Sequence, residues 1–93
     1  MTAQAIAFQG LIEGRVQGVF FRAETLRQAS SLQLTGWVRN TAQGHVEVLL
    51  CGLEADVNEM IAWLHHGPAL ARVERVTLGP VACPTLDGFE ILV

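Results

Sequence analysis

Hydrophobic and polar residues follow one another in this chain with two different periods. Residues 5–13 alternate: Phe8 and Ile12 fall on one face of an extended chain, and Ala7 and Gln9 fall on the other. The first face is more apolar than the second, and such a difference is typical of a sheet that is fully covered on one side only. We therefore predict a first strand over residues 5–13.

Two segments have helical spacing instead. Within residues 22–33, Thr25, Ala29 and Leu32 are separated by four and three positions, which places them on one face of a helix. Residues 54–66 show a similar periodicity, carry acidic residues in their first turn, and are followed by a Gly-Pro pair that stops a helix. We predict a helix over each segment.

Shorter apolar stretches predict the remaining strands. The apolar residues of segment 71–78 are unevenly spaced, which indicates a strand with a β-bulge. Residues 79–88 are predicted as a loop. The second strand begins with residues 37–39, residues 40–44 form a hairpin turn, the third strand covers residues 45–51, and a short last strand covers residues 89–93.

The order of these elements, βαββαβ with a short last strand, indicates an α+β fold. It predicts a ferredoxin-like two-layer sandwich with two helices on one face of an antiparallel sheet. The chain has 93 residues, of which 51% are hydrophobic, so it can form one domain with its own core over residues 1–93. Fold alone does not define function, because this architecture hosts many activities.

Composition and charge narrow the class of protein. All six basic residues are arginine, and nine acidic residues bring the formal charge to −3, which argues against nucleic-acid binding. No apolar run approaches the roughly 20 residues that span a bilayer, and the first residues lack the pattern of a signal peptide. We therefore expect a cytoplasmic protein without a membrane partner.

The two cysteines, Cys51 and Cys83, lie in no metal-binding or redox spacing. In a reducing cytosol we expect both to be free thiols, and a disulfide between them is the less favoured alternative. No cluster of residues suited to a metal ion or an organic cofactor stands out, so we expect neither.

The strongest candidate for chemistry is GRVQGVFFR at residues 14–22, between the first predicted strand and the first predicted helix. Gly14 and Gly18 remove side chains at two points, so backbone N–H groups can turn inward around a small object. The helix adds free first-turn N–H groups, and Arg15 and Arg22 add positive charge. An anion, and first of all a phosphate, suits such a site. The alternative is a glycine-rich connection with solvated arginines.

Chain geometry predicts that Asn40 lies close to Arg22. The first helix carries the chain away from the loop by about 18 Å over a dozen residues. The second strand returns it by about 16 Å over five residues, so Asn40 reaches the same edge of the sheet. From the residues alone, an asparagine with a structural role in a turn is the simpler interpretation.

Residues 14–22 resemble the signature of the acylphosphatase family, whose loop binds a phosphoryl group. A second pattern of that family follows in GWVRN at residues 36–40, and a looser match lies at residues 67–76. The likeness covers nearly the whole chain, roughly residues 6–89. The second pattern continues at the family's spacing with Gly44, Val46 and Gly52.

The resemblance implies a reaction and roles for particular residues. The reaction would be hydrolysis of an acyl phosphate to a carboxylate and inorganic phosphate, without a metal ion. Arg22 and backbone amides of the loop would hold the phosphoryl group, and Asn40 would orient the attacking water. The amides concerned belong to Gln17, Gly18, Val19, Phe20 and Phe21. We expect a monomer whose partners are a small acyl phosphate and its phosphate product.

Two other interpretations compete with a free-standing enzyme. A non-catalytic ferredoxin-like module could bind a phosphorylated metabolite or RNA. An RNA-binding sheet would expose aromatic residues on its central strands, and residues 46–50 contain none. The chain could also resemble the domain that opens hydrogenase-maturation carbamoyltransferases, although its end at Val93 favours the free-standing enzyme.

Overall fold

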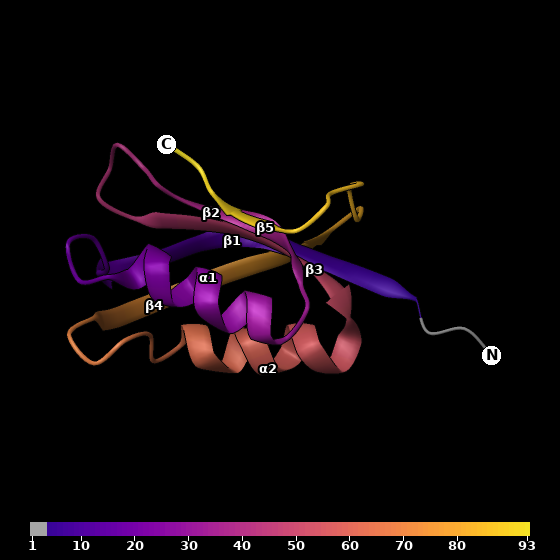
Figure 1. Cartoon of the computed structure of the whole chain (residues 1–93). Coiled ribbons are helices and arrows are strands. Elements are labelled where there is room, and N and C mark those ends of the chain that lie inside the picture. Colours follow the sequence, from indigo (N-terminus) through magenta and orange to yellow (C-terminus); the bar gives the residue numbers. More distant parts are fainter. Residues whose placement is uncertain (1–3) are drawn as a thin grey trace.

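The computed structural model describes residues 4–93, which form one sheet with two helices against one of its faces (Figure 1). The predicted order of elements is confirmed. The strands are β1 (Ala5–Arg15), β2 (Thr35–Asn40), β3 (Val46–Leu53), β4 (Arg72–Val81) and β5 (Phe89–Ile91), and the helices are α1 (Phe21–Ser31) and α2 (Glu54–Leu64).

The strands lie in the order β4-β1-β3-β2-β5. The pairs among β1, β2, β3 and β4 are antiparallel, and β5 runs parallel to β2. The prediction of an α+β, ferredoxin-like sandwich is therefore confirmed, but a wholly antiparallel sheet is wrong for the last strand. The reason is the connection, since residues 82–88 cross the sheet from β4 at one edge to the outer side of β2, where β5 runs in the direction of β2.

The main core lies between the sheet and the two helices. The opposite face of the sheet carries a smaller buried cluster of Ala7, Leu49 and Cys51, with Trp37 packed beside it. The unequal faces predicted from the first strand are thus present in the structure. The hydrophobic members of the main core with no exposed surface are Ile12, Ala29, Val38, Val46, Val48, Leu50, Val57, Met60 and Leu64.

Element boundaries differ from the predictions by a few residues. Helix α1 ends at Ser31 because Gln33 adopts a φ of 58°, which a right-handed helix cannot contain. Strands β1 and β4 continue to Arg15 and Val81, beyond their predicted ends, because they pair with each other along this length. Pairing between strands, which local periodicity does not report, sets these boundaries.

The predicted irregularity in the fourth strand is confirmed. Glu13 pairs with Arg75, but the next residue, Gly14, pairs with Val73. Glu74 is therefore the extra residue of a β-bulge in β4. The bulge lies just before the end of β1, next to the loop that leads to α1.

The prediction of two free thiols is wrong, because Cys51 and Cys83 form a disulfide. Their Cα atoms are 5.9 Å apart. Val81 at the end of β4 pairs with Ala7, and Ala7 pairs with Cys51, so the chain that leaves β4 starts level with Cys51. The crossing segment then brings Cys83 onto it. Within residues 4–93, no helix is long and apolar enough to span a membrane.

Candidate active site

The loop between β1 and α1 has an unusual backbone. Gly18 has a φ of 74°, and Phe20, which is the N-cap residue of α1, has a φ of 64°. Positive φ at alternate residues turns successive N–H groups toward one side, which is the geometry of an anion-binding nest. For a residue with a side chain, this conformation costs on the order of 1–3 kcal/mol and marks functional sites. The backbone at Gly18 and Phe20 is thus compatible with an anion-binding loop.

Apolar contacts hold this loop in place from behind. Val16 and Val19 are buried, with 1% and 4% of their surface exposed, and they belong to the main core. Phe21 is buried as well and packs against Trp63 of α2, with ring centroids 5.8 Å apart. The loop backbone is thus attached to the core on both sides of the exposed Gly18.

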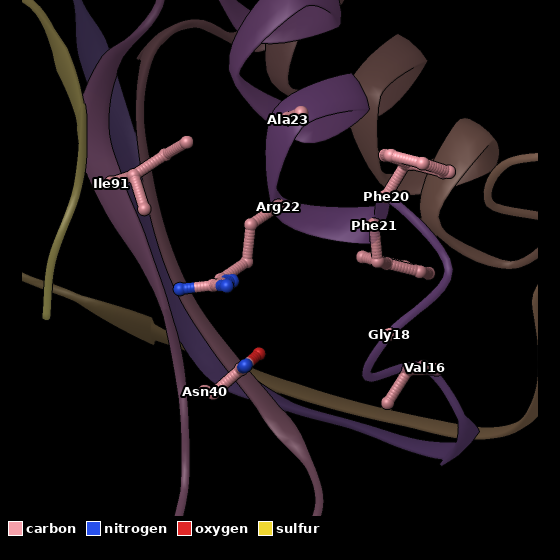
Figure 2. Close-up of a pocket in the computed structure, with 8 residues that line it drawn as sticks. All are labelled: Val16, Gly18, Phe20, Phe21, Arg22, Ala23, Asn40 and Ile91. Carbon is pink, nitrogen blue, oxygen red and sulfur yellow. The ribbon is translucent and has the colours of Figure 1, made fainter.

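Arg22 and Asn40 meet at one cavity of about 340 Å³. Arg22 comes from the first turn of α1, and Asn40 is the last residue of β2. Figure 2 shows the two side chains pointing toward each other across the cavity. The predicted proximity of these residues is present in the structure. The lining residues are Val16, Gly18, Phe20, Phe21, Arg22, Ala23, Asn40 and Ile91.

The Arg22 guanidinium has no ion-pair partner among residues 4–93. The arginines that do form ion pairs lie elsewhere: Arg27 pairs with Glu24, Arg39 with Glu47 and Arg75 with Glu13. Arg22 therefore presents an uncompensated positive charge beside the loop. A planar guanidinium can bind two oxygens of a phosphate at once.

Asn40 also has an unused polar atom. Its Oδ1 is buried and has no hydrogen-bond partner in the described part of the chain, where Thr25 Oγ1 is the other such atom. The predicted hairpin turn over residues 40–44 begins too early, because Asn40 still pairs with Val46 in the sheet. Its backbone is thus held by the β2–β3 ladder. Asn40 lines the cavity, so its side-chain amide can form hydrogen bonds with a group bound there.

Gln17 connects the loop to the β2–β3 hairpin. Its Nε2 donates hydrogen bonds to the carbonyl oxygens of Thr41, at 3.0 Å, and His45, at 2.8 Å. Thr41 directly follows Asn40, so this side chain couples the position of the loop to that of Asn40. Sequence reasoning assigned Gln17 a backbone role alone. The one signal for the side chain was a long polar residue in an otherwise apolar and glycine-rich loop.

Only some of the other predicted site residues line the cavity. Gly18, Phe20 and Phe21 line the cavity with Arg22, whereas Gln17 and Val19 do not. Ile91 of β5 lines it and was not predicted as a site residue, because the pairing of β5 with β2 brings it there. Arg15 is exposed at the end of β1 and does not line the cavity.

Comparison with known proteins places this chain in a family. A family model described as acylphosphatase matches residues 8–91. The chain belongs to the acylphosphatase family. A protein named acylphosphatase from Azoarcus sp. is 47% identical over 87% of this chain and 83% of its own length. The structure of an acylphosphatase from Coxiella burnetii is 34% identical, with a TM-score of 0.91 over 95% of this chain and 93% of that one.

The family and the enzyme class predicted from the sequence motifs are therefore confirmed, and the non-catalytic module is not favoured. A crystal structure of full-length HypF also contains this fold. It is 25% identical, with a TM-score of 0.88, and the match covers 100% of this chain but 12% of that one. The same domain thus occurs both as a small protein and as a part of a larger one.

Proposed function

We propose that this protein hydrolyses acyl phosphates at the cavity between Arg22 and Asn40. The phosphoryl group lies in the loop and accepts hydrogen bonds from its backbone amides and from the Arg22 guanidinium. Asn40 orients the attacking water. The observation that carries the proposal is the convergence of the Arg22 guanidinium and the Asn40 side chain on one cavity, beside a loop with positive φ at Gly18 and Phe20.

The reaction requires little from the protein except position and charge. The water oxygen forms a bond to phosphorus while the bond between phosphorus and the acyl oxygen breaks, and the water gives up a proton to the phosphate product. The leaving carboxylate is a weak base, so no strong acid is needed to protonate it. Negative charge on the phosphoryl oxygens is stabilised by donors that are already in place before the reaction.

The Asn40 side chain suits the orientation of water. An amide is not a base at neutral pH, so it accepts a hydrogen bond from the water without removing its proton. Such a contact orders the water relative to the phosphorus atom and thereby reduces the entropic part of the barrier. Hydrolysis without a metal ion stays a prediction, as do a monomeric state and a cytoplasmic location.

The first test compares Arg22→Ala with Arg75→Ala, a matched control at an exposed arginine of β4. Hydrolysis of benzoyl phosphate is measured in excess chelator, together with inhibition by inorganic phosphate. A charge-assisted contact is worth about 1.5–3 kcal/mol, so Arg22→Ala should weaken phosphate binding about 10- to 150-fold. Arg22→Lys should not restore it, because a point charge lacks the planar fork.

The control variant should keep the wild-type values. Equal behaviour of the two alanine variants would contradict the assignment of the phosphate site to Arg22. Loss of wild-type activity in chelator, with recovery on addition of magnesium, would contradict a metal-independent reaction.

A further inference from the structure

We propose that a second cavity, next to the first, binds the acyl group of the substrate and selects apolar, uncharged acyl groups such as aromatic ones. This cavity, called the acyl groove below, has a volume of about 430 Å³. It lies between α1 and the end of α2 with the segment that follows, with Trp63, Pro68 and Leu70 on one side and Glu24 and Arg27 on the other. The inference rests on the proposed phosphate site at Arg22.

Phe20 joins the acyl groove to the phosphate site. It lines both cavities, so the two share one wall. Val19, the preceding loop residue, lines the groove as well. The two cavities therefore meet at Phe20, the residue that they share.

Two strongly exposed apolar side chains lie together at this place. Phe20 is 73% exposed and Leu70 is 67% exposed, and both border the groove. Among the large hydrophobic side chains of residues 4–92, these two are the most exposed. Exposed apolar side chains that border a common cavity are typical of a binding site, since a ligand removes them from water.

The backbone of Phe20 explains why its ring is on the outside. A left-handed residue at the start of α1 turns its side chain away from the core, and Phe21 fills the buried position instead. Figure 2 shows the Phe20 ring and the Arg22 guanidinium on different sides of the start of α1. The strain at Phe20 thus serves two purposes: it shapes the amide nest and presents an aromatic wall.

The charges of the groove indicate what it selects. Glu24 and Arg27, its charged residues, are 2.7 Å apart and form an ion pair with each other. Neither is left to attract a charged group on the ligand. The apolar wall of Phe20, Trp63 and Leu70 therefore favours an uncharged, apolar acyl group over a short or charged one.

Binding of phosphonates tests the groove without catalysis. Methylphosphonate and benzylphosphonate are titrated separately while the NMR signals of the protein are followed. Both should shift the loop amides. Benzylphosphonate alone should also shift the Trp63 indole and Leu70 methyl signals, and it should bind about 3- to 10-fold more tightly. Equal effects of the two phosphonates on Trp63 and Leu70 would overturn the proposal.

A second test measures the kinetics of Leu70→Ala. Leu86→Ala, a substitution of another exposed leucine, is the matched control. Loss of apolar contact should raise the KM for benzoyl phosphate about 3- to 10-fold. The KM for acetyl phosphate and inhibition by inorganic phosphate should be unchanged, because Leu70 lies outside the phosphate site. Equal changes for both substrates, or none, would overturn the groove alone. If the wild-type protein hydrolysed neither substrate, the proposed function itself would be wrong.

Discussion

Asn40 combines a fixed backbone with an unused side-chain oxygen. Its backbone pairs with Val46 in the sheet, and its buried Oδ1 lacks a partner within residues 4–93. A buried acceptor without a donor costs about 1–3 kcal/mol. This cost to the fold has a functional counterpart if the oxygen accepts a hydrogen bond from the attacking water. Removal of the side chain should therefore affect the reaction much more than the fold.

Asn40→Ala should lower kcat for an acyl phosphate by roughly 10²–10³, the range for loss of one preorganised polar group. Inhibition by inorganic phosphate should change little, because Arg22 and the loop are intact. The free energy of unfolding should stay the same or rise slightly, since an unpaired buried group is removed. Steady-state kinetics and denaturant unfolding of the same preparation measure all three quantities.

Asn40→Asp separates water orientation from charge. The side chain is nearly isosteric, but it brings a negative charge toward a bound anion, so both phosphate affinity and kcat should fall. A variant Asn40→Ala that kept most of its turnover would contradict the role in water orientation. So would a loss that unfolding of the variant explains in full.

At the level of elements, the site depends on the connection between the loop and the β2–β3 hairpin. Gln17 donates to the Thr41 and His45 carbonyl groups and thereby fixes how far the nest lies from Asn40. Both carbonyl groups belong to the hairpin that directly follows Asn40. A small change in this distance would move the water relative to the phosphorus atom, and catalysis is sensitive to shifts of about 1 Å.

Gln17→Ala should therefore lower kcat at least about tenfold while the domain stays folded. Two neutral hydrogen bonds are lost, each worth about 0.5–1.5 kcal/mol of stability. The kcat is measured at a temperature well below unfolding, where a loss of stability alone would leave it unchanged. Gln43→Ala, an exposed glutamine in the same hairpin, is the control and should behave as wild type. Normal kcat in Gln17→Ala would contradict the positioning role.

The sequence predicted those parts of the fold and site that depend on local pattern. The spacing of hydrophobic residues indicated both helices, and the positions of the glycines indicated the loop. The lengths of the first helix and second strand indicated that Arg22 and Asn40 lie close together. The contacts of Gln17, the lining role of Ile91 and the direction of β5 depend on which strands become neighbours. Periodicity describes one segment at a time, so it contains no information on such pairing. The acyl groove likewise exists only because α1 and the segment after α2 are brought together.

At the scale of the whole molecule, the last part of the chain crosses the sheet from β4 at one edge to β5 at the other. The segment that leaves β4 is joined to β3 by the Cys51–Cys83 disulfide, and β5 then pairs with β2. The chain between the two cysteines has a sequence separation of 32 and includes α2 and β4. The bond therefore connects the central strand β3 to the segment that leaves the edge strand β4. Its formation depends on this crossing of the chain. The expectation of free thiols was based on a reducing cytosol alone and did not include the crossing.

Loss of this bond should reduce stability and leave the reaction intact. Closure of a loop of this length is worth about 3–4 kcal/mol in the chain-entropy model. In a domain of this size that corresponds to a fall in Tm of more than about 10 °C. The reaction should be unaffected because Cys51 lies five residues along β3 from Val46, the partner of Asn40, or about 17 Å away.

Thermal unfolding of wild type and Cys83→Ser, each with and without a reductant, measures the effect. Wild type should lose stability in the reductant, and the variant should have the same lower Tm in both conditions. The kcat should be alike in all four samples, because β5 keeps its hydrogen bonds from Gly36 N–H to the Gly88 carbonyl and from Leu92 N–H to the Val38 carbonyl. An unchanged wild-type Tm in reductant would show that the bond adds no stability. A fall in kcat would instead show that the crossing segment controls the position of Ile91 in the active-site cavity.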